Sequence, residues 1–404
     1  MANTINTVKD GPGIFAKGIA ETLRDNLVLC NFVEKADESD FDGKNGFKSG
    51  DTIYTSIPPR YIPQQDDLDI TSSIQDSVEE KKPLTLNKTE TVGMKLDSLE
   101  LATDIQVASA LKRHGIPAAE AIAQNMESRC FGIAQKAIYN SVGTPGSNTF
   151  GVSDILAART KLNQDLCRPG DRGLFMNSAS GAQAVDARKG LFQDSTSIAG
   201  QYKSGMIGRA DGFDWYETEL INTHTNGADV TGAAVNDASV SEGASTLTVD
   251  GLSAPPTEGS IFTLPGVFKV HPITKAVTSE LHQFVVGAGA TTTVLPISPS
   301  LYAASGGLQN VNALPADDAA LTFVGAASTG YAQNLALHKS AFKMVTAPLY
   351  APKGVDLVAT QTVDGITVNL VRDFDIKTRE VITRLDVLYA FDPVRAEWGT
   401  RLTA

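Results

Sequence analysis

The sequence predicts an α+β fold that is interrupted by an all-β domain. Residues 118–140 carry apolar side chains at spacings of three and four, which is typical of one long amphipathic helix. Short runs on both sides of this helix alternate apolar with polar residues, which indicates strands. Residues 228–326 are dominated by Thr, Ser, Ala, Gly and Val, with strand-like runs between turn residues, so they form the predicted all-β insertion.

Residues 11–32 are expected to form the first helix. Pro12 suits a first helical turn, where its missing N–H is not needed. Phe15, Ile19 and Leu23 follow at spacings of four and give one apolar stripe. The simpler interpretation is a helix that packs within its own subunit; the alternative is an N-terminal arm that docks on a neighbouring subunit.

A long hairpin is predicted after this helix. Residues 51–58 indicate a strand, and residues 83–97 its partner, because Leu84, Leu86, Val92, Met94 and Leu96 keep to even positions. A polar, charged stretch, residues 60–82, lies between them. A lone hairpin of this length is marginal in water, so it needs support from the rest of the fold or from another subunit.

The remaining elements are expected at the following places. Helices are predicted at 153–166, with Ser153 as N-cap, and at 180–190, and a buried strand opens at Leu174. A glycine-punctuated segment, 205–218, enters an aromatic strand, and residues 334–345 begin with another strand. Strands at 365–372 and 380–391 are joined as a hairpin by 373–379. The insertion has strand-like runs at 245–249, 260–264, 283–286, 292–297 and 320–324.

Charge and cysteine content exclude several classes of protein. The 34 basic and 46 acidic residues give a net charge of −12, which argues against a protein that binds nucleic acid by neutralising phosphates. The sequence has no apolar run long enough for a membrane span, and its first residues do not resemble a signal peptide. Cys30, Cys130 and Cys167 are far apart, so we expect reduced thiols rather than a disulfide framework or metal site.

The sequence contains no catalytic constellation. Its five histidines lack metal-ligand spacing, and no GxSxG, Walker A or dinucleotide-binding motif is present. The paired carboxylates Asp66/Asp67 and Glu79/Glu80 lie in a polar stretch, where no burial is expected to raise their pKa values. We therefore expect no enzyme activity, no catalytic or metal-binding residue, and no cofactor.

One set of segments resembles a known family. The segments are Tyr202-Lys-Ser-Gly-Met-Ile-Gly-Arg-Ala-Asp-Gly-Phe-Asp-Trp-Tyr-Glu, Asn334-Leu-Ala-Leu-His-Lys-Ser-Ala-Phe and Arg384-Leu-Asp-Val-Leu-Tyr-Ala. The predicted elements of the chain occur in the order N-terminal helix, charged hairpin, spine-like helix, α/β body and late hairpin. This organisation resembles the major capsid proteins of tailed phages, with the Hong Kong 97-type (HK97-like) fold. The insertion, with Thr52-Ile-Tyr and Val92-Gly-Met in the hairpin, is similar to the coat proteins of short-tailed Salmonella-type podoviruses.

The resemblance implies a role for each part of the chain. In order along the sequence these are an N-terminal arm (1–43), an E-loop hairpin (44–97), a peripheral domain with the spine helix (98–150), the first part of an axial domain (151–227), an inserted β-barrel or sandwich (228–326), and the second axial and peripheral part (327–404).

The implied function is assembly of a shell. Such a protein forms hexamers and pentamers of an icosahedral capsid that encloses double-stranded DNA, by way of a scaffold-directed procapsid that expands. The density of charge in the E-loop places subunit contacts at Arg60, Asp66, Asp67, Asp69, Glu79, Glu80, Lys81 and Lys82. Gly43, Gly46 and Gly50, at the base of the hairpin, are the candidate hinges. Lys81 and Lys82 lie in the loop that some phages crosslink to Asn, but no crosslink is expected here.

The implied partners are further copies of the chain, a scaffolding protein, a portal and possible decoration proteins. The shell encloses DNA without specific binding, contacts no membrane, and is assembled in the bacterial host cytoplasm before it becomes the virion capsid. Three alternatives remain. An encapsulin-like nanocompartment shell would lack the β insertion, and a tail-tube or decoration protein would lack the spine helix. An enzyme with a carbohydrate-binding-like insertion would need a nucleophile–base or metal constellation.

Overall fold

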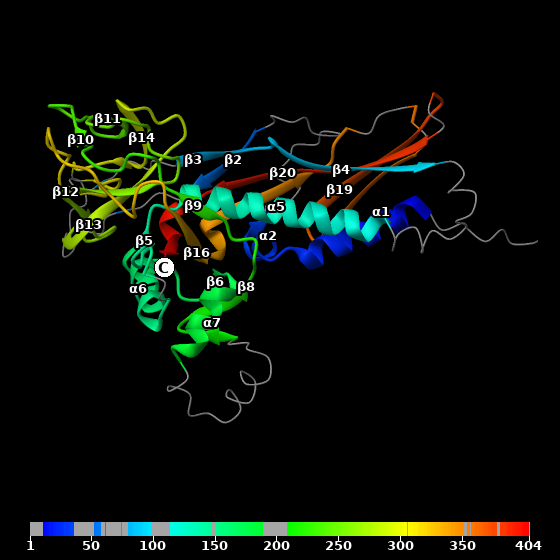
Figure 1. The fold of residues 1–404 in the computed structure, drawn as a ribbon, viewed down its shortest axis with the longest axis horizontal. Coiled ribbons are helices and arrows are strands. Elements are labelled where there is room, and N and C mark those ends of the chain that lie inside the picture. The colour runs from blue at the N-terminus through cyan, green and yellow to red at the C-terminus, as the bar shows by residue number, and fades with distance from the viewer. Residues whose placement is uncertain are drawn as a thin grey trace, which may run out of the picture. The chain divides into compact units, whose positions relative to one another are not determined.

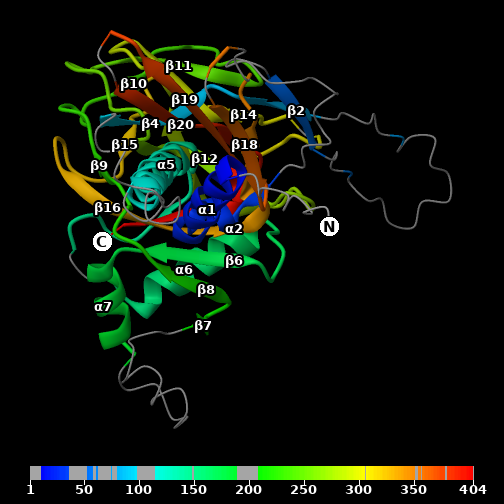
Figure 2. The ribbon, with the colours of Figure 1, turned by 90° about the vertical axis from the view of Figure 1, so that its right-hand side faces the viewer.

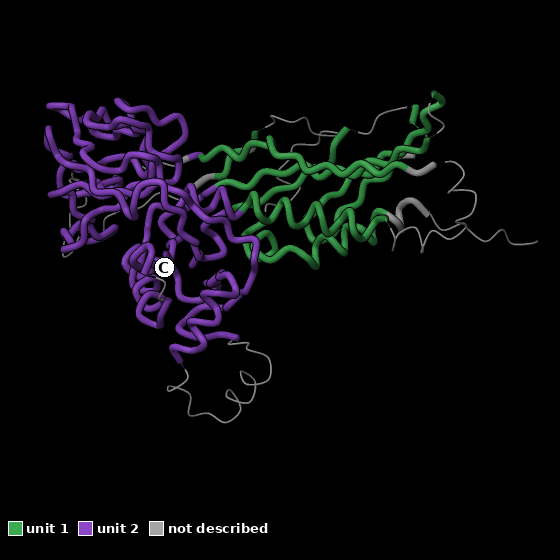
Figure 3. The backbone as a smooth tube through the Cα atoms, viewed as in Figure 1, with its two compact units in different colours: residues 1–55, 82–130, 343–392 green, residues 56–81, 131–342, 393–404 purple. Residues whose placement is uncertain are grey.

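The chain divides into two compact units (Figure 3). Unit 1 contains residues 1–55, 82–130 and 343–392, and unit 2 contains residues 56–81, 131–342 and 393–404. The computed structural model describes residues 11–35, 52–57, 61, 74, 80–97, 114–147, 150–188, 208–304, 306–350, 354–355, 357–377 and 380–403. No helix within these ranges is long and apolar enough to cross a membrane.

Unit 1 is built on one sheet with the strand order β1-β17-β20-β19-β18, in which β4 also pairs with β20. The strands are β1 Glu34–Lys35, β4 Lys88–Asp97, β17 Phe342–Ala347, β18 Leu357–Val363, β19 Ile366–Asp375 and β20 Glu380–Pro393. As expected, β19 and β20 form an antiparallel hairpin, with Asp375 opposite Glu380 at its end. β20 is long enough to pair with β19 along one edge and with β4 along the other.

Helices α1 and α5 lie along the same face of this sheet (Figures 1 and 2). α1 (Gly11–Asn26) packs on β18 and β19, and its Ile19 and Leu23 are fully buried there. β1 extends the sheet by pairing parallel to β17. The N-terminal segment therefore packs within its own subunit from α1 to β1.

The predicted helix over 11–32 is broken in two. α1 ends at Asn26, and α2 spans Leu29–Phe32. The side chain of Asn31 donates hydrogen bonds to the carbonyl oxygens of Arg24 and Leu27, each at 2.6 Å. The carboxylate of Glu127 accepts the N–H groups of Val28 (3.2 Å) and Leu29. A break in a helix leaves backbone N–H and carbonyl groups without hydrogen-bond partners. The side chains of Asn31 and Glu127 supply partners for these groups and so stabilise the break.

The predicted pairing of the hairpin strands is confirmed only in part: residues 83–85, at the start of the predicted partner strand, lie in the strand that pairs with residues 52–57, whereas residues 88–97 pair elsewhere. β2 (Thr52–Ile57) pairs with β3 (Glu80–Thr85) in a separate two-stranded sheet. β4 begins two residues after β3 ends and pairs along ten residues with β20, from Asp97 opposite Glu380 to Lys88 opposite Tyr389. Period-two alternation runs through both β3 and β4, because the described even-numbered side chains of β4 are less exposed than its odd-numbered ones and Leu84 of β3 is buried. Alternation alone does not identify the partner strand.

Unit 2 contains a sheet with the order β5-β21-β16-β6-β8-β7, with β9 paired to β16. The strands are β5 Ser141–Val142, β6 Arg172–Met176, β7 Arg209–Ala210, β8 Phe213–Glu217, β9 Thr223–Thr225, β16 Gly330–His338 and β21 Gly399–Thr403. Phe175 on β6 lies edge-on to Phe131 and stacks on Tyr216 of β8. The predicted aromatic strand is thus part of the core of this sheet.

Helices α6 and α7 lie in unit 2, whereas α5 contains residues of both units. α5 spans Ile116–Ala137, α6 spans Val152–Gln164, and α7 spans Ser178–Asp186. The predicted N-cap, Ser153, lies inside α6: Gly151 is the cap residue, and its N–H donates to the carboxylate of Asp154 at 3.0 Å. α7 starts two residues before its prediction, because the side chain of Asn177 accepts the N–H of Ser180.

The insertion forms a second sheet in unit 2, with the order β10-β11-β14-β13-β12-β15. The strands are β10 Ala234–Val235, β11 Ala244–Asp250, β12 Ile261–Val270, β13 Val277–Val286, β14 Val294–Leu301 and β15 Thr322–Phe323. Each of the five strand-like runs predicted from the sequence overlaps one of the strands β11 to β15. Its buried core includes Phe262, Phe284, Leu295 and Leu301.

Candidate functional site

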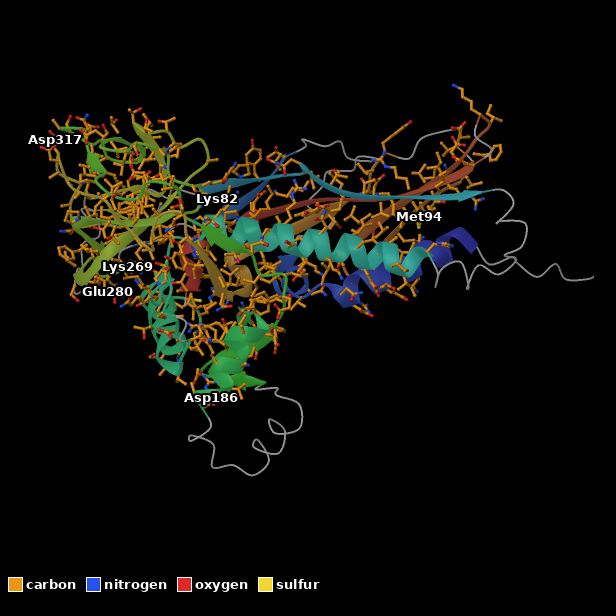
Figure 4. All side chains as sticks on the ribbon, viewed as in Figure 1. Lys82, Met94, Asp186, Lys269, Glu280 and Asp317 are labelled. Atoms are coloured by element: carbon orange, nitrogen blue, oxygen red, sulfur yellow. The ribbon has the colours of Figure 1, made fainter. Side chains whose placement is uncertain are left out.

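The predicted E-loop includes the β2–β3 ribbon, in which several described side chains are exposed. The hydroxyls of Thr52 and Thr85 lie 3.3 Å apart across it. The Tyr54 side chain is 65% exposed, Lys81 is exposed, and Lys82, labelled in Figure 4, is half-buried. This ribbon therefore presents an aromatic ring and a positive charge to solvent.

Most residues predicted for the site lie outside the described ranges. They are Arg60, Asp66, Asp67, Asp69 and Glu79, together with the candidate hinges Gly43, Gly46 and Gly50. Glu80 begins β3 and Phe15 lies in α1, but their side chains are not described.

Two charged residues that the sequence analysis missed lie buried on β4. Lys88 Nζ lies 3.3 Å from Asp392 Oδ1. The Glu90 carboxylate accepts hydrogen bonds from Arg129 and from the hydroxyl of Tyr389, both at 3.0 Å, and burial raises the Tyr389 pKa. The sequence does contain a signal for their burial, because Lys88 and Glu90 occupy even-numbered positions in a strand whose other even-numbered residues are apolar. Charged residues in such a run predict buried ion pairs.

A second buried carboxylate connects α5 to the N-terminal segment. Glu127 on α5 is fully buried and accepts the N–H groups at the start of α2. Burial raises the pKa of Glu127, and these backbone hydrogen bonds oppose that rise. Beside it, the Cys30 thiol of α2 donates to the Cys130 sulfur of α5 at 3.4 Å.

In unit 2, a buried ionic cluster fastens the inserted sheet to α6. Lys269 Nζ of β12 lies 2.5 Å from Asp165 Oδ1, just beyond the end of α6. Asn140 donates to the other oxygen of Asp165 at 3.0 Å. Burial raises the pKa of Asp165, and the Lys269 charge opposes that rise. Because both charges are buried, loss of either one leaves the other without its counter-ion.

A second ion pair lies on the neighbouring strand. Lys161 of α6 is 3.4 Å from Glu280 of β13, and burial lowers the Lys161 pKa. Figure 4 shows Lys269 and Glu280 at the same end of the inserted sheet, whereas Asp317 lies at another end. The cluster is therefore concentrated where the insertion meets α6.

Further side-chain contacts complete this junction. The side-chain amide of Gln283 accepts the N–H of Ser141 at 2.8 Å and donates to its carbonyl at 3.1 Å, which imitates a strand pairing. His282 stacks between Tyr139 and Phe284, and burial lowers its pKa to about 3. Arg401 of β21 is fully buried and donates to the Gly259 carbonyl at 2.8 Å; burial lowers its pKa to about 9.

These clusters fix segments to one another. Within the described ranges, no group of three or more His, Cys, Asp or Glu residues is placed to hold a metal ion. Ion pairs join β4 to α5 and the insertion to α6, and backbone hydrogen bonds to the buried Glu127 carboxylate join α2 to α5. Such contacts set the geometry of a subunit.

Several solved capsid structures resemble the chain. The capsid of Ralstonia phage GP4 matches at 7% identity over 92% of this chain and 87% of its own, with a TM-score of 0.48. Mycobacterium phage Che8 matches at 12% identity over 93% and 90%, with a TM-score of 0.45. The CUS-3 coat protein I-domain covers 24% of this chain and 97% of its own at 28% identity, with a TM-score of 0.19. No curated protein matches.

The chain is a major capsid protein of the tailed-phage class. Residues 5–404 match the family described as "P22 coat protein - gene protein 5", and the chain belongs to this family. The match spans almost the whole sequence, so both units and the inserted sheet fall within it. The predicted capsid function is confirmed.

Proposed function

We propose that this chain assembles as hexamers and pentamers of an icosahedral shell around double-stranded DNA, with an HK97-type fold and the inserted sheet as a separate β domain. The observation that carries the proposal is the family match over residues 5–404. A scaffolding protein directs a procapsid that expands on maturation, a portal occupies one vertex, and assembly takes place in the host cytoplasm.

The parts of the chain take the roles that the resemblance implied. In this assignment unit 1 holds the N-terminal arm, the peripheral sheet and the first part of the spine helix α5. Unit 2 holds the axial sheet and the insertion. The long β4–β20 pairing supports the proposal, because it anchors one arm of the E-loop in the unit 1 sheet while β2 and β3 form a separate two-stranded sheet.

The E-loop is proposed to contact a neighbouring subunit through its charged residues. Lys81 is exposed on β3, so a reversed charge there changes a contact without disturbing a core. The Lys81→Glu variant is expected to need a several-fold higher concentration to form closed shells in the presence of the scaffolding protein. The measurement is the yield of shells against subunit concentration by sedimentation.

The matched control is Lys339→Glu, which makes the same charge change at an exposed residue of unit 2. Far-ultraviolet circular dichroism checks that both variants fold. Normal shell yield for Lys81→Glu, or equal loss in both variants, would contradict a contact through Lys81.

The scaffold requirement is tested by expression with and without the scaffolding protein of the same phage. The proposal predicts uniform closed shells only with the scaffold, and irregular or open assemblies without it. Uniform shells in both cases would overturn the scaffold-directed route while leaving the capsid function intact.

A further inference from the structure

Two thiols meet in the buried contact between α2 and α5. Cys30 on α2 and Cys130 on α5 are both fully buried, and their sulfurs lie 3.4 Å apart. A disulfide bond is about 2.05 Å long, so the sulfurs need to approach by about 1.4 Å. Each side chain can rotate about its Cα–Cβ bond, which is the motion that shortens this distance.

We propose that Cys30 and Cys130 are a latent disulfide site, where oxidation by a low-molecular-weight disulfide fastens the N-terminal segment to α5. The third cysteine, Cys167, lies in unit 2 and donates to the carbonyl oxygen of its neighbour Arg168 at 3.7 Å. The structure therefore pairs two of the three thiols.

The chemistry is two successive exchanges. A thiolate of the pair attacks one sulfur of oxidised glutathione; the released glutathione thiolate takes up the proton that the cysteine lost. The second cysteine thiolate then attacks the protein sulfur of this mixed disulfide, and a second glutathione leaves and takes up its proton. Two protein thiols are oxidised, and one molecule of oxidised glutathione is reduced to two of glutathione.

Burial sets the condition for the first exchange. The thiolate is the reactive form, and the hydrogen bond to Cys130, followed by burial, raises the pKa of Cys30 well above its usual range. The reaction therefore starts when α2 opens away from α5. α2 has only four residues, and its opening requires the loss of the hydrogen bonds from its first N–H groups to Glu127.

The site is tested on the purified, unassembled full chain, so the result does not depend on shell formation. The chain is incubated with oxidised glutathione at mildly alkaline pH, free thiols are blocked, and the protein is digested with trypsin without reduction. Cys30 then lies in the peptide 25–35, Cys130 in 130–136 and Cys167 in 162–172.

We expect one predominant disulfide-linked pair, 25–35 with 130–136, while 162–172 stays unlinked. Cys167→Ser should leave this pair unchanged, and Cys30→Ser should abolish it. Glutathione adducts on both cysteines without a link, or a predominant link to Cys167, would overturn the proposal. The test depends on disulfide mapping of the wild-type chain, so it remains decisive even if a variant folds poorly.

Hydrogen exchange tests whether the bond holds α2 in place. The amides of Phe32 and Val33 bond to the carbonyls of Val28 and Leu29, and they exchange when α2 opens. Oxidation is expected to slow their exchange by roughly tenfold or more. Unchanged exchange in a chain that carries the bond would contradict the fastening of α2.

Discussion

Glu127 shows at the scale of one residue how a carboxylate far along the chain shapes the N-terminal segment. Its side chain holds the start of α2, but it lies almost one hundred residues away in sequence. Periodicity over residues 11–32 could predict the apolar stripe of Ile19 and Leu23, both of which are buried. It could not predict the break, because the group that stabilises the break belongs to another helix.

The first prediction concerns the pH dependence of Glu127. Burial raises its folded-state pKa above the ordinary value of 4.5, so the stability that Glu127 contributes is greatest below pH 4.5 and is lost as pH rises through the folded pKa. Relative to Glu127→Gln, the wild type should therefore lose unfolding free energy as pH rises from 4 to 7.

Urea denaturation at several pH values measures this difference. Glu120→Gln, on an exposed position of the same helix, controls for the loss of one negative charge. A wild-type advantage over Glu127→Gln that grows as pH rises would show that the buried carboxylate is not the cause.

The second prediction concerns His282. Burial, with the nearby charge of Lys269, lowers its pKa from 6.5 to about 3, so the neutral ring contributes stability above pH 6.5 that is lost as pH falls toward 3. His282→Phe keeps an aromatic ring between Tyr139 and Phe284 but cannot take up a proton. The variant should lose less stability than the wild type between pH 6.5 and 4, as measured by thermal unfolding. Equal loss in both would contradict this assignment.

At the scale of elements, strands and helices were largely predictable, and so was the local β19–β20 hairpin, whereas strand partners distant in the sequence were not. The β-branched, turn-punctuated runs of the insertion correspond to β11 through β15, and the spine helix begins within two residues of its predicted start. The pairing of β4 with β20 joins residues that are about three hundred positions apart. Likewise, nothing local to Lys269 indicates Asp165, because the contact arises only when β12 docks on the end of α6.

The third prediction tests that docking. Asp165→Asn leaves the Lys269 charge buried without its partner, which should cost roughly 3–5 kcal/mol of unfolding free energy. Lys269→Met should also destabilise the chain, by leaving Asp165 unpaired. The double variant Asp165→Asn/Lys269→Met should recover much of the loss, because no uncompensated charge remains. Additive losses in a double-mutant cycle by urea denaturation would argue against a coupled pair.

The fourth prediction concerns the turn after β11. Gly251 has a φ of +78°, and a Cβ there would overlap the carbonyl oxygen of Gly232. Gly289 has a φ of +81°, but a Cβ there would meet nothing within 4 Å. Gly289→Ala therefore costs only backbone strain, roughly 1–2 kcal/mol. Gly251→Ala adds steric overlap and should cost roughly 2–5 kcal/mol by urea denaturation. Equal losses would contradict the close approach.

At the scale of the whole molecule, the capsid function could be inferred from the order of segments, and the family match confirms it. The residues that contact neighbouring subunits were harder to predict from the sequence. Six of the eight charged residues proposed for the E-loop have no described side chain, and contact between copies is a property of the assembly. Composition agrees with the overall account in one respect: a net charge of −12 is unfavourable for binding to DNA through its phosphates.

Cryo-electron microscopy of particles from cells that co-express this chain with its scaffolding protein tests the central claim most directly. The account predicts closed shells of uniform diameter with icosahedral symmetry, built from hexamers and pentamers of this chain. Each subunit should show the β2–β3 ribbon against a neighbour and the inserted sheet fastened to α6. Subunits that fold but remain monomeric, or that form only open tubes or sheets, would contradict it.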